Sequence, residues 1–145
     1  MAKSHAVITS WCVLKNKSQE TKEKISELAV SETGIKLIPA NTVIMSFKLT
    51  IGKTAITSEP LYTNEAIAAF IPKSEKINND YLRYALSLKD WTAEAKKAVK
   101  GATLNKESIE NSQVFIPNKE EQDNFAVFVQ QSDKSKHLLE ICPFF

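Results

Sequence analysis

The chain has 145 residues, a length typical of a single domain, and its hydrophobic (43%) and charged (25%) fractions are ordinary for a globular protein. The formal net charge of +2, from 19 basic and 17 acidic residues, neither requires nor excludes nucleic acid, because a basic patch can lie on a nearly neutral chain. The sequence shows no signal peptide and no apolar run of membrane length, which predicts a cytoplasmic protein with no membrane partner.

Residues 1–34 predict a strand and a short helix. Apolar runs at residues 6–8 and 11–14 predict one strand, or a strand followed by a turn. From residue 18 to residue 30 the pattern becomes helical, because apolar side chains recur on one face. Gly34 then stands where a glycine C-cap would end this helix.

Residues 35–71 alternate short apolar runs with turn residues, which predicts three strands. The β-branched and aromatic run 43–47 predicts the first strand, and residues 54–57 predict the second. Gly52, in the turn between them, can adopt a positive φ at low cost. The third strand, residues 66–71, is apolar on both faces, so we expect it to be covered on both sides.

Two consecutive helices are predicted after these strands. Asn78, Asn79 and Asp80 offer N-cap side chains to the first helix, residues 81–89, and Asp90 can cap the second, residues 91–100. Together with the strands, these helices predict the α+β class, with a small mixed or antiparallel sheet and packed helices.

The last part of the chain predicts a strand and a long helix. Residues 106–111 predict one helical turn, and residues 114–116 a strand. Asn118 and Glu121 resemble a capping box that opens the long helix. This helix is polar nearly all round outside a short apolar stripe, so we expect the stripe to bind a partner. The stripe consists of Phe125, Phe128 and Val129.

The sequence contains no recognisable catalytic or metal-binding arrangement. Residues 51–54 resemble the end of a phosphate-binding loop, but Phe47 stands where that loop needs a glycine, and a strand rather than a helix follows. His5 and His137 have no carboxylate or cysteine partner in a recognisable arrangement, and the two cysteines are far apart. We therefore expect a chain that is not an enzyme and has no catalytic residue, metal or cofactor.

Polar and basic residues beside two predicted turns are the candidate DNA contacts. A lysine holds a phosphate through its point charge, whereas Asn and Thr side chains reach base edges or sugars. A single loop lysine is more often merely solvated, but several of them in turns at strand ends favour DNA binding. The candidates are Lys48, Thr50, Lys53, Lys100, Thr103, Asn105 and Lys106. Stacking on bases is a further use for Tyr81, Tyr84 and Trp91, but their helical spacing favours the core.

An ordered series of segments resembles one known family. The series is LIPANTVIMS, KLTIGKTAIT, NEAIAAFIPK, YLRYAL, KGATLNKESIENSQVFIP and the EEQ that opens the last helix. It resembles the second half of a target recognition domain from the DNA specificity subunit of type I restriction–modification systems. The resemblance covers most of the chain from about residue 20 onward, and the order of the segments carries it rather than any single motif.

Subunits of this family carry two target recognition domains joined by long antiparallel helices, and each domain reads one half of a bipartite DNA site. The helices dock methyltransferase subunits, restriction subunits join the assembly, and the specificity subunit does no chemistry. For this chain the resemblance implies a partial target recognition domain at residues 1–117 and the start of a spacer helix at residues 118–145. The implied partners are double-stranded DNA, the methyltransferase subunit and, through it, the restriction subunit.

Two departures from the family leave other interpretations open. Only 19 residues precede the matching segment, where the family usually has several more strands, and Pro143 breaks the last helix early. The alternatives are a half-subunit that forms a homodimer, and a truncated, DNA-inactive remnant that binds only the methyltransferase or itself. Unpaired apolar sheet edges would favour self-association.

Overall fold

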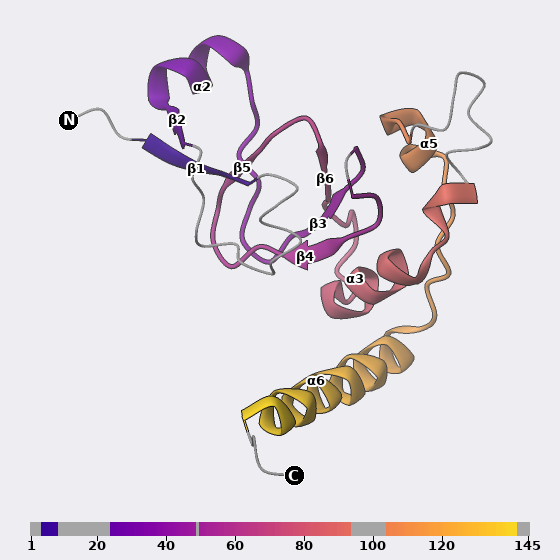
Figure 1. Cartoon of the computed structure of the whole chain (residues 1–145). Coiled ribbons are helices and arrows are strands. Elements are labelled where there is room, and N and C mark those ends of the chain that lie inside the picture. The colour runs from indigo at the N-terminus through magenta and orange to yellow at the C-terminus, as the bar shows by residue number, and fades with distance from the viewer. Residues whose placement is uncertain (1–3, 9–23, 49, 94–103, 142–145) are drawn as a thin grey trace.

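The computed structural model describes residues 4–8, 24–48, 50–93 and 104–141, and it confirms the α+β class (Figure 1). Two three-stranded sheets form the N-terminal part, and helices cover the C-terminal side. The elements are β1 (Ser4–Ile8), β2 (Lys24–Ser26), α2 (Glu27–Thr33), β3 (Val43–Ser46), β4 (Thr54–Ile56), β5 (Tyr62–Thr63), β6 (Ile67–Phe70), α3 (Asn79–Leu88), α5 (Lys106–Glu110) and α6 (Lys119–Ile141).

The sheet with strand order β4-β3-β6 is antiparallel throughout and confirms the three strands expected in residues 35–71. Strand β3 lies in the middle and is fully buried. Val43 and Met45 belong to one core cluster and Ile44 to another, because alternate side chains of a strand point to opposite faces. The expectation that residues 66–71 are covered on both sides is confirmed for β6, since Ala68 and Phe70 pack against one core cluster and Ile67 and Ala69 belong to or pack against the other, although only Ile67 of this edge strand is fully buried.

The second sheet has the order β2-β1-β5, with β2 antiparallel and β5 parallel to β1. The helix expected over residues 18–30 begins only at residue 27, because residues 24–26 pair with β1 instead. Ser26 then caps α2, and its hydroxyl accepts a hydrogen bond from the Ala29 amide at 3.3 Å. Gly34, with φ 64°, ends the helix in the left-handed conformation, as expected. Residues 11–14 and 18–23 lie outside the described residues.

Helix α3 packs against β3 and β4, and α6 packs against α3 (Figure 1). Asn78 is the N-cap of α3, as expected, and its side chain accepts hydrogen bonds from the amides of Asp80 and Tyr81. Leu82 and Leu86 on the inner face of α3 are buried in the same core cluster as Val43. Asp90 caps a helical turn at residues 91–93 through hydrogen bonds from two following amides.

The helical turn expected at residues 106–111 is confirmed as α5, but the strand expected at residues 114–116 is not formed. Side chains rather than a neighbouring strand bind the backbone carbonyls of this segment. The Tyr81 hydroxyl donates to the Phe115 carbonyl at 3.1 Å, and the Lys89 ammonium donates to the Gln113 carbonyl at 2.9 Å. An apolar run therefore becomes an extended connection with Phe115 exposed. It leads into the long helix expected from residue 119.

Candidate functional site

The turn between β3 and β4 is closed at its base by hydrogen bonds, and residue 49 within it lies outside the described residues. The Ser46 amide donates to the Lys53 carbonyl at 2.9 Å, and the Gly52 amide donates to the Ser46 carbonyl at 3.0 Å. The buried Ser46 hydroxyl also donates to the Thr50 carbonyl. Gly52 has φ 82°, a conformation that costs a residue with a Cβ about 1–2 kcal/mol. These hydrogen bonds and the backbone conformation of Gly52 together define the base of the turn.

The Trp91 side chain packs against this turn at Gly52. A Cβ added at Gly52 would lie 3.0 Å from the Trp91 Cδ1 atom, so glycine is required both for its φ and for the close approach. The indole is 2% exposed, and its N–H donates to the Leu86 carbonyl at 2.8 Å. The prediction that Trp91 belongs to the core rather than to a base-stacking surface is therefore confirmed.

Both lysines of the turn are exposed, but their surroundings differ. The Lys48 ammonium lies 3.6 Å from the Glu65 carboxylate, which belongs to the neighbouring β5–β6 connection. A hydrogen bond from its own backbone amide and, second, the charge of Lys48 lower the pKa of the Glu65 carboxyl. A phosphate that bound Lys48 would have to compete with this carboxylate. Thr50 is half-buried, whereas Lys53 projects from the start of β4.

The second candidate segment lies on the same core as the turn. Leu104 is 1% exposed and belongs to the cluster against which Phe47 and Ile51 of the turn pack. Beside it, the Asn105 side chain caps α5 by accepting a hydrogen bond from the Ser108 amide at 2.7 Å. Lys106 is exposed and lies 3.6 Å from the Glu110 carboxylate one helical turn away. Figure 1 shows the β3–β4 turn on the side of the molecule where α5 lies.

The described candidates are neighbours in sequence of Phe47, Ile51 and Leu104, which belong to or pack against one core cluster. These candidates are Lys48, Thr50, Lys53, Asn105 and Lys106. Asn105 has a local structural role as a cap, whereas Lys48, Lys53 and Lys106 are exposed and Thr50 is half-buried. The other two predicted residues, Lys100 and Thr103, lie outside the described residues.

A second functional region is the junction between α3 and α6. The Phe125 ring packs edge-on against Tyr81 and Tyr84, with ring centroids 5.5 and 5.8 Å apart. The Tyr84 hydroxyl donates to the Asp133 carboxylate at 2.7 Å. Burial, followed by this hydrogen bond, raises the pKa of Tyr84. The two tyrosines thus serve internal packing, as expected.

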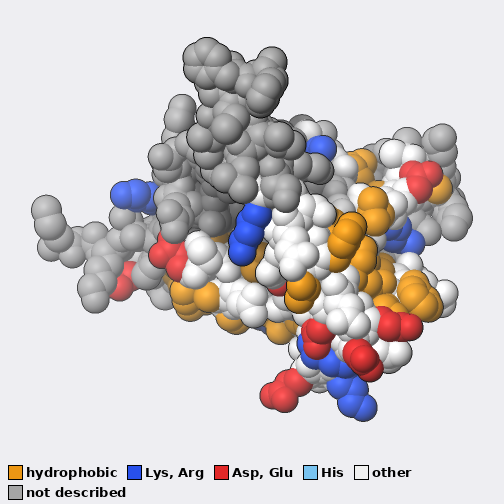
Figure 2. Space-filling model, turned by 90° about the horizontal axis from the view of Figure 1, so that it is seen from below, with side chains coloured by type: hydrophobic (Ala, Val, Ile, Leu, Met, Phe, Trp, Pro, Cys, Tyr) orange, Lys and Arg blue, Asp and Glu red, His pale blue; other side chains and the backbone are white. Residues whose placement is uncertain are grey.

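The three residues of the predicted partner-binding stripe have different environments. Phe125 is engaged by α3, and Val129 is half-buried in the groove between the two helices. Phe128 is 66% exposed, and Val127 beside it is also exposed. Figure 2, a view from the side of α6, shows hydrophobic side chains gathered on this face of the molecule. Phe128 is thus the member of the stripe that is free to contact a partner.

Gln122 is a residue of this junction that the sequence analysis named only as part of the EEQ that opens the last helix, without a role of its own. It is 1% exposed, and its side chain joins three other parts of the chain. Its Oε1 atom accepts a hydrogen bond from the Asn78 amide at 2.9 Å. Its Nε2 atom donates to the carbonyls of Lys76, at 3.1 Å, and Pro117, at 2.9 Å. A glutamine in the first turn of a polar helix carries no sequence signal that distinguishes it from a solvated one.

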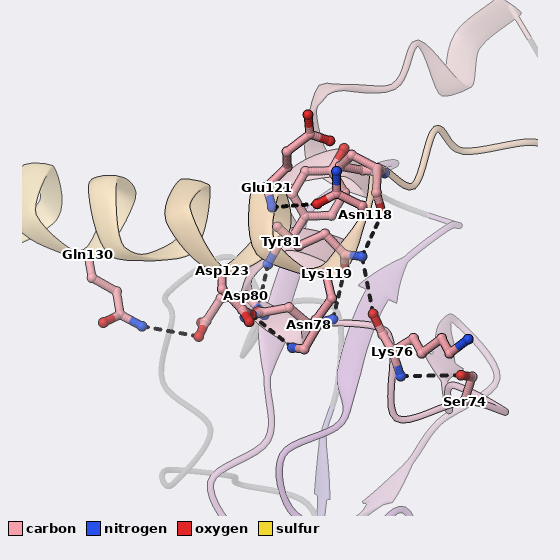
Figure 3. A network of polar contacts seen from close by, with 12 residues as sticks. Ser74, Lys76, Asn78, Asp80, Tyr81, Asn118, Lys119, Glu121, Asp123 and Gln130 are labelled. Carbon is pink, nitrogen blue, oxygen red and sulfur yellow. Dashed lines mark hydrogen bonds and ion pairs between the residues drawn. The ribbon is translucent and has the colours of Figure 1, made fainter.

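Polar contacts continue around this residue (Figure 3). The Asn78 Nδ2 atom donates to the Asp123 carboxylate at 2.6 Å, and the Lys119 ammonium lies 2.8 Å from the same oxygen. Hydrogen bonds from Lys119 and then Asn78 lower the pKa of Asp123. Asn118 accepts a hydrogen bond from the Glu121 amide at 3.0 Å and so caps α6, as expected.

Two specific alternatives, a metal cluster and a phosphate-binding loop at residues 51–54, are not formed by the described residues. The described residues contain no group of His, Cys, Asp and Glu side chains that could hold a metal ion. Residues 54–56 form a strand after the Gly-Lys pair, so no helix N-terminus is present there to bind phosphate. Within the same residues, no helix is long and apolar enough to span a membrane.

Comparison with solved structures shows the class of fold. The HsdS subunit from Thermoanaerobacter tengcongensis matches with a TM-score of 0.57 and 19% identity, over 75% of this chain and 26% of that one. A chain from a structural study of complex assembly and conformational transition of the type I R-M system matches with a TM-score of 0.58 and 19% identity. That match covers 72% of this chain and 26% of the other.

Sequence comparison identifies the family. The model of the type I restriction modification DNA specificity domain matches residues 8–140, and the chain belongs to this family. It is 29% identical over 112 residues to the MjaIX specificity subunit of Methanocaldococcus jannaschii, and 28% identical over 105 residues to the HindI specificity subunit of Haemophilus influenzae. These matches cover 75% and 70% of this chain, but the chain spans only about a quarter of the length of these relatives, 26% and 23%.

Proposed function

We propose that the chain is a DNA-recognition part of a type I specificity subunit and does no chemistry itself. The family match over residues 8–140 is the observation that carries this proposal. Within it, residues 1–117 form the recognition unit, and residues 118–145 begin the helix that binds the partner.

We place the DNA-contacting surface at the β3–β4 turn and the adjoining start of α5. Exposed Lys48, Lys53 and Lys106 supply positive charge for phosphates, and Thr50 supplies a hydroxyl. The hydrogen-bonded base of the turn and the indole next to Gly52 support this assignment, because contacts that already order part of a surface reduce the entropy lost on binding. Lys100 and Thr103 remain proposed members of this surface.

The methyltransferase subunit is the partner proposed for α6, and the restriction subunit would join through it. The support is physical: Phe128 exposes a large aromatic surface on a helix whose opposite face is already packed on α3. Exposed aromatic rings also favour a homodimer when the partner is absent, and light scattering at high protein concentration distinguishes a dimer from a monomer.

Selection of bound duplexes from a random-sequence library, with the matching methyltransferase subunit present, tests the DNA-reading proposal. We expect enrichment of a short motif, which would be the half-site. Retention of DNA without enrichment would contradict sequence reading. It would favour the alternative, a module that binds the methyltransferase only. Lys48 already pairs with Glu65, and the Asn105 side chain already caps α5, which is consistent with that alternative.

Phe128→Asp tests the docking proposal independently of DNA. We expect the affinity for the methyltransferase subunit to fall about tenfold or more, as for a central aromatic contact. Leu28→Asp on α2 is the matched control, because Leu28 is 68% exposed and lies on another element. Equal affinities of the two variants would exclude Phe128 from the interface.

A further inference from the structure

We propose that Gln122 is the positioning residue that fixes the direction in which α6 leaves the rest of the chain. This inference deepens the proposed function and rests on it, since the direction of α6 sets where its exposed Phe128 lies relative to the β3–β4 turn. The contacts of Gln122 nonetheless belong to the chain itself, so they can be tested without DNA or a partner.

The connection before α6 does not determine this direction by itself. Residues 112–118 form neither helix nor strand, and the hydrogen bonds described for their carbonyls include long side chains from α3 and the residue after it. The orientation of α6 must therefore come from its contact with α3, the element against which it packs.

The contacts between α3 and α6 differ in how much free energy their loss would cost. The Tyr84–Asp133 and Gln130–Asp80 hydrogen bonds are exposed, and the Arg83–Asp133 ion pair spans 4.0 Å. Water replaces exposed bonds of this kind at little cost. Edge-on ring contacts such as that of Phe125 tolerate small rotations, because they have no fixed donor and acceptor.

Gln122 is different because its polar groups are bonded where water does not reach them. One acceptor and two donors bind the loop before α3, the N-cap of α3 and the residue before the N-cap of α6. A rotation of α6 about this point would leave buried groups without partners, which is far more costly than losing an exposed bond. A glutamate would place a carboxylate beside two carbonyl oxygens, and a leucine would offer no hydrogen bond.

Distances between spin labels, measured by double electron–electron resonance on the full chain, test this role. Glu59→Cys with Lys134→Cys measures the position of α6, and Glu59→Cys with Lys36→Cys measures the rest of the fold, both in a Cys12→Ser/Cys142→Ser background. Residue 134 lies about 18 Å along the helix from residue 122, so a swing of about 10° displaces the label by about 3 Å.

We expect a narrow distance distribution for both pairs in the parent chain. Gln122→Leu and Gln122→Glu should each broaden or shift only the α6 pair, by about 3 Å or more, because leucine offers no hydrogen bond and glutamate offers no donor to the two carbonyls. Gln130→Leu, one exposed hydrogen bond on the same helix, is the control and should leave both pairs unchanged. Three results would overturn the proposal. Both Gln122 variants could broaden the distance distributions of both pairs, they could leave the α6 pair unchanged, or the α6 pair could already be broad in the parent chain. DNA affinity is measured separately, so failure of the proposed function would be recognised by itself.

Discussion

The β3–β4 turn and the α3–α6 junction use polar groups in opposite ways. In the turn, backbone hydrogen bonds fix the shape, and the charged side chains of Lys48 and Lys53 are exposed to solvent. In the junction, the side chains of Gln122 and Asn78 bind one another's segments, and the main exposed feature is the apolar ring of Phe128. The first region thus has exposed charge on a hydrogen-bonded turn, and the second has bonded polar groups beside an exposed aromatic side chain.

The two regions therefore suit different kinds of partner. Exposed ammonium groups favour an anionic partner such as the DNA backbone, and their effect must weaken with salt. An exposed aromatic ring favours a protein surface, and its contribution depends little on salt.

Trp91→Ala should cost about 3–5 kcal/mol of unfolding free energy, because it removes a buried indole from the core that supports the turn. Urea unfolding followed by far-UV circular dichroism measures the loss. Leu88→Ala, at a residue that is 78% exposed, is the control and should change stability by less than about 0.5 kcal/mol. A similar small change for Trp91→Ala would mean that the turn does not depend on this support.

Gln122→Leu should lower the unfolding free energy by about 1–3 kcal/mol, because the partly buried Asn78 amide and the carbonyls of Lys76 and Pro117 lose their buried partner. Gln130→Leu removes one exposed hydrogen bond and should change it by less than about 0.5 kcal/mol. The same urea titration compares the two variants. Equal losses of unfolding free energy would show that the hydrogen bonds of Gln122 contribute no more to stability than the exposed hydrogen bond of Gln130.

Gly52→Ala should destabilise the chain by more than Gly34→Ala does. Both residues have a positive φ, so each substitution costs about 1–2 kcal/mol of backbone strain. Gly34 has no atom within 4 Å of an added Cβ, whereas Gly52 has the Trp91 ring at 3.0 Å. The difference between the two variants in thermal unfolding therefore isolates the contact with the indole. Equal midpoints would contradict the close approach.

The smallest effects concern acid stability. The folded pKa values of Glu65 and Asp123 lie below their ordinary values of 4.5 and 3.8. Each carboxylate therefore contributes stability that is complete above the ordinary pKa and is lost as pH falls through the lower, folded pKa. Glu65→Gln and Asp123→Asn should each flatten the acid limb of a pH–stability curve below about pH 5 and leave its neutral region nearly unchanged. A steeper acid limb in either variant would mean that the sign is wrong.

Much of this fold could be predicted from the sequence because its signals are local. The β-branched run in β3, the glycines at positions 34 and 52, and the cap residues Asn78 and Asn118 all adopt the structures that their chemistry favours. The family resemblance, carried by the order of the segments, is confirmed by the match over residues 8–140.

The failures share a physical cause, which is dependence on distant partners. Residues 24–26 have a helical pattern but pair with β1, a strand that lies far away in the sequence. Residues 114–116 have the composition of a strand but do not form one. Instead, the side chains of Tyr81 in α3 and of Lys89 donate hydrogen bonds to the backbone carbonyls of Phe115 and Gln113. Gln122 acquires its role only when three segments meet around it.

The salt dependence of DNA binding by a Lys48→Ala/Lys53→Ala variant tests the central claim most directly. If both lysines bind phosphates, the slope of log K against log salt should become shallower by about 2, because each phosphate contact contributes about 0.9. Lys36→Ala/Lys73→Ala removes two exposed lysines from other loops and should leave the slope close to that of the parent chain. Parallel slopes for the parent and the Lys48→Ala/Lys53→Ala variant would contradict the assignment of the β3–β4 turn to DNA.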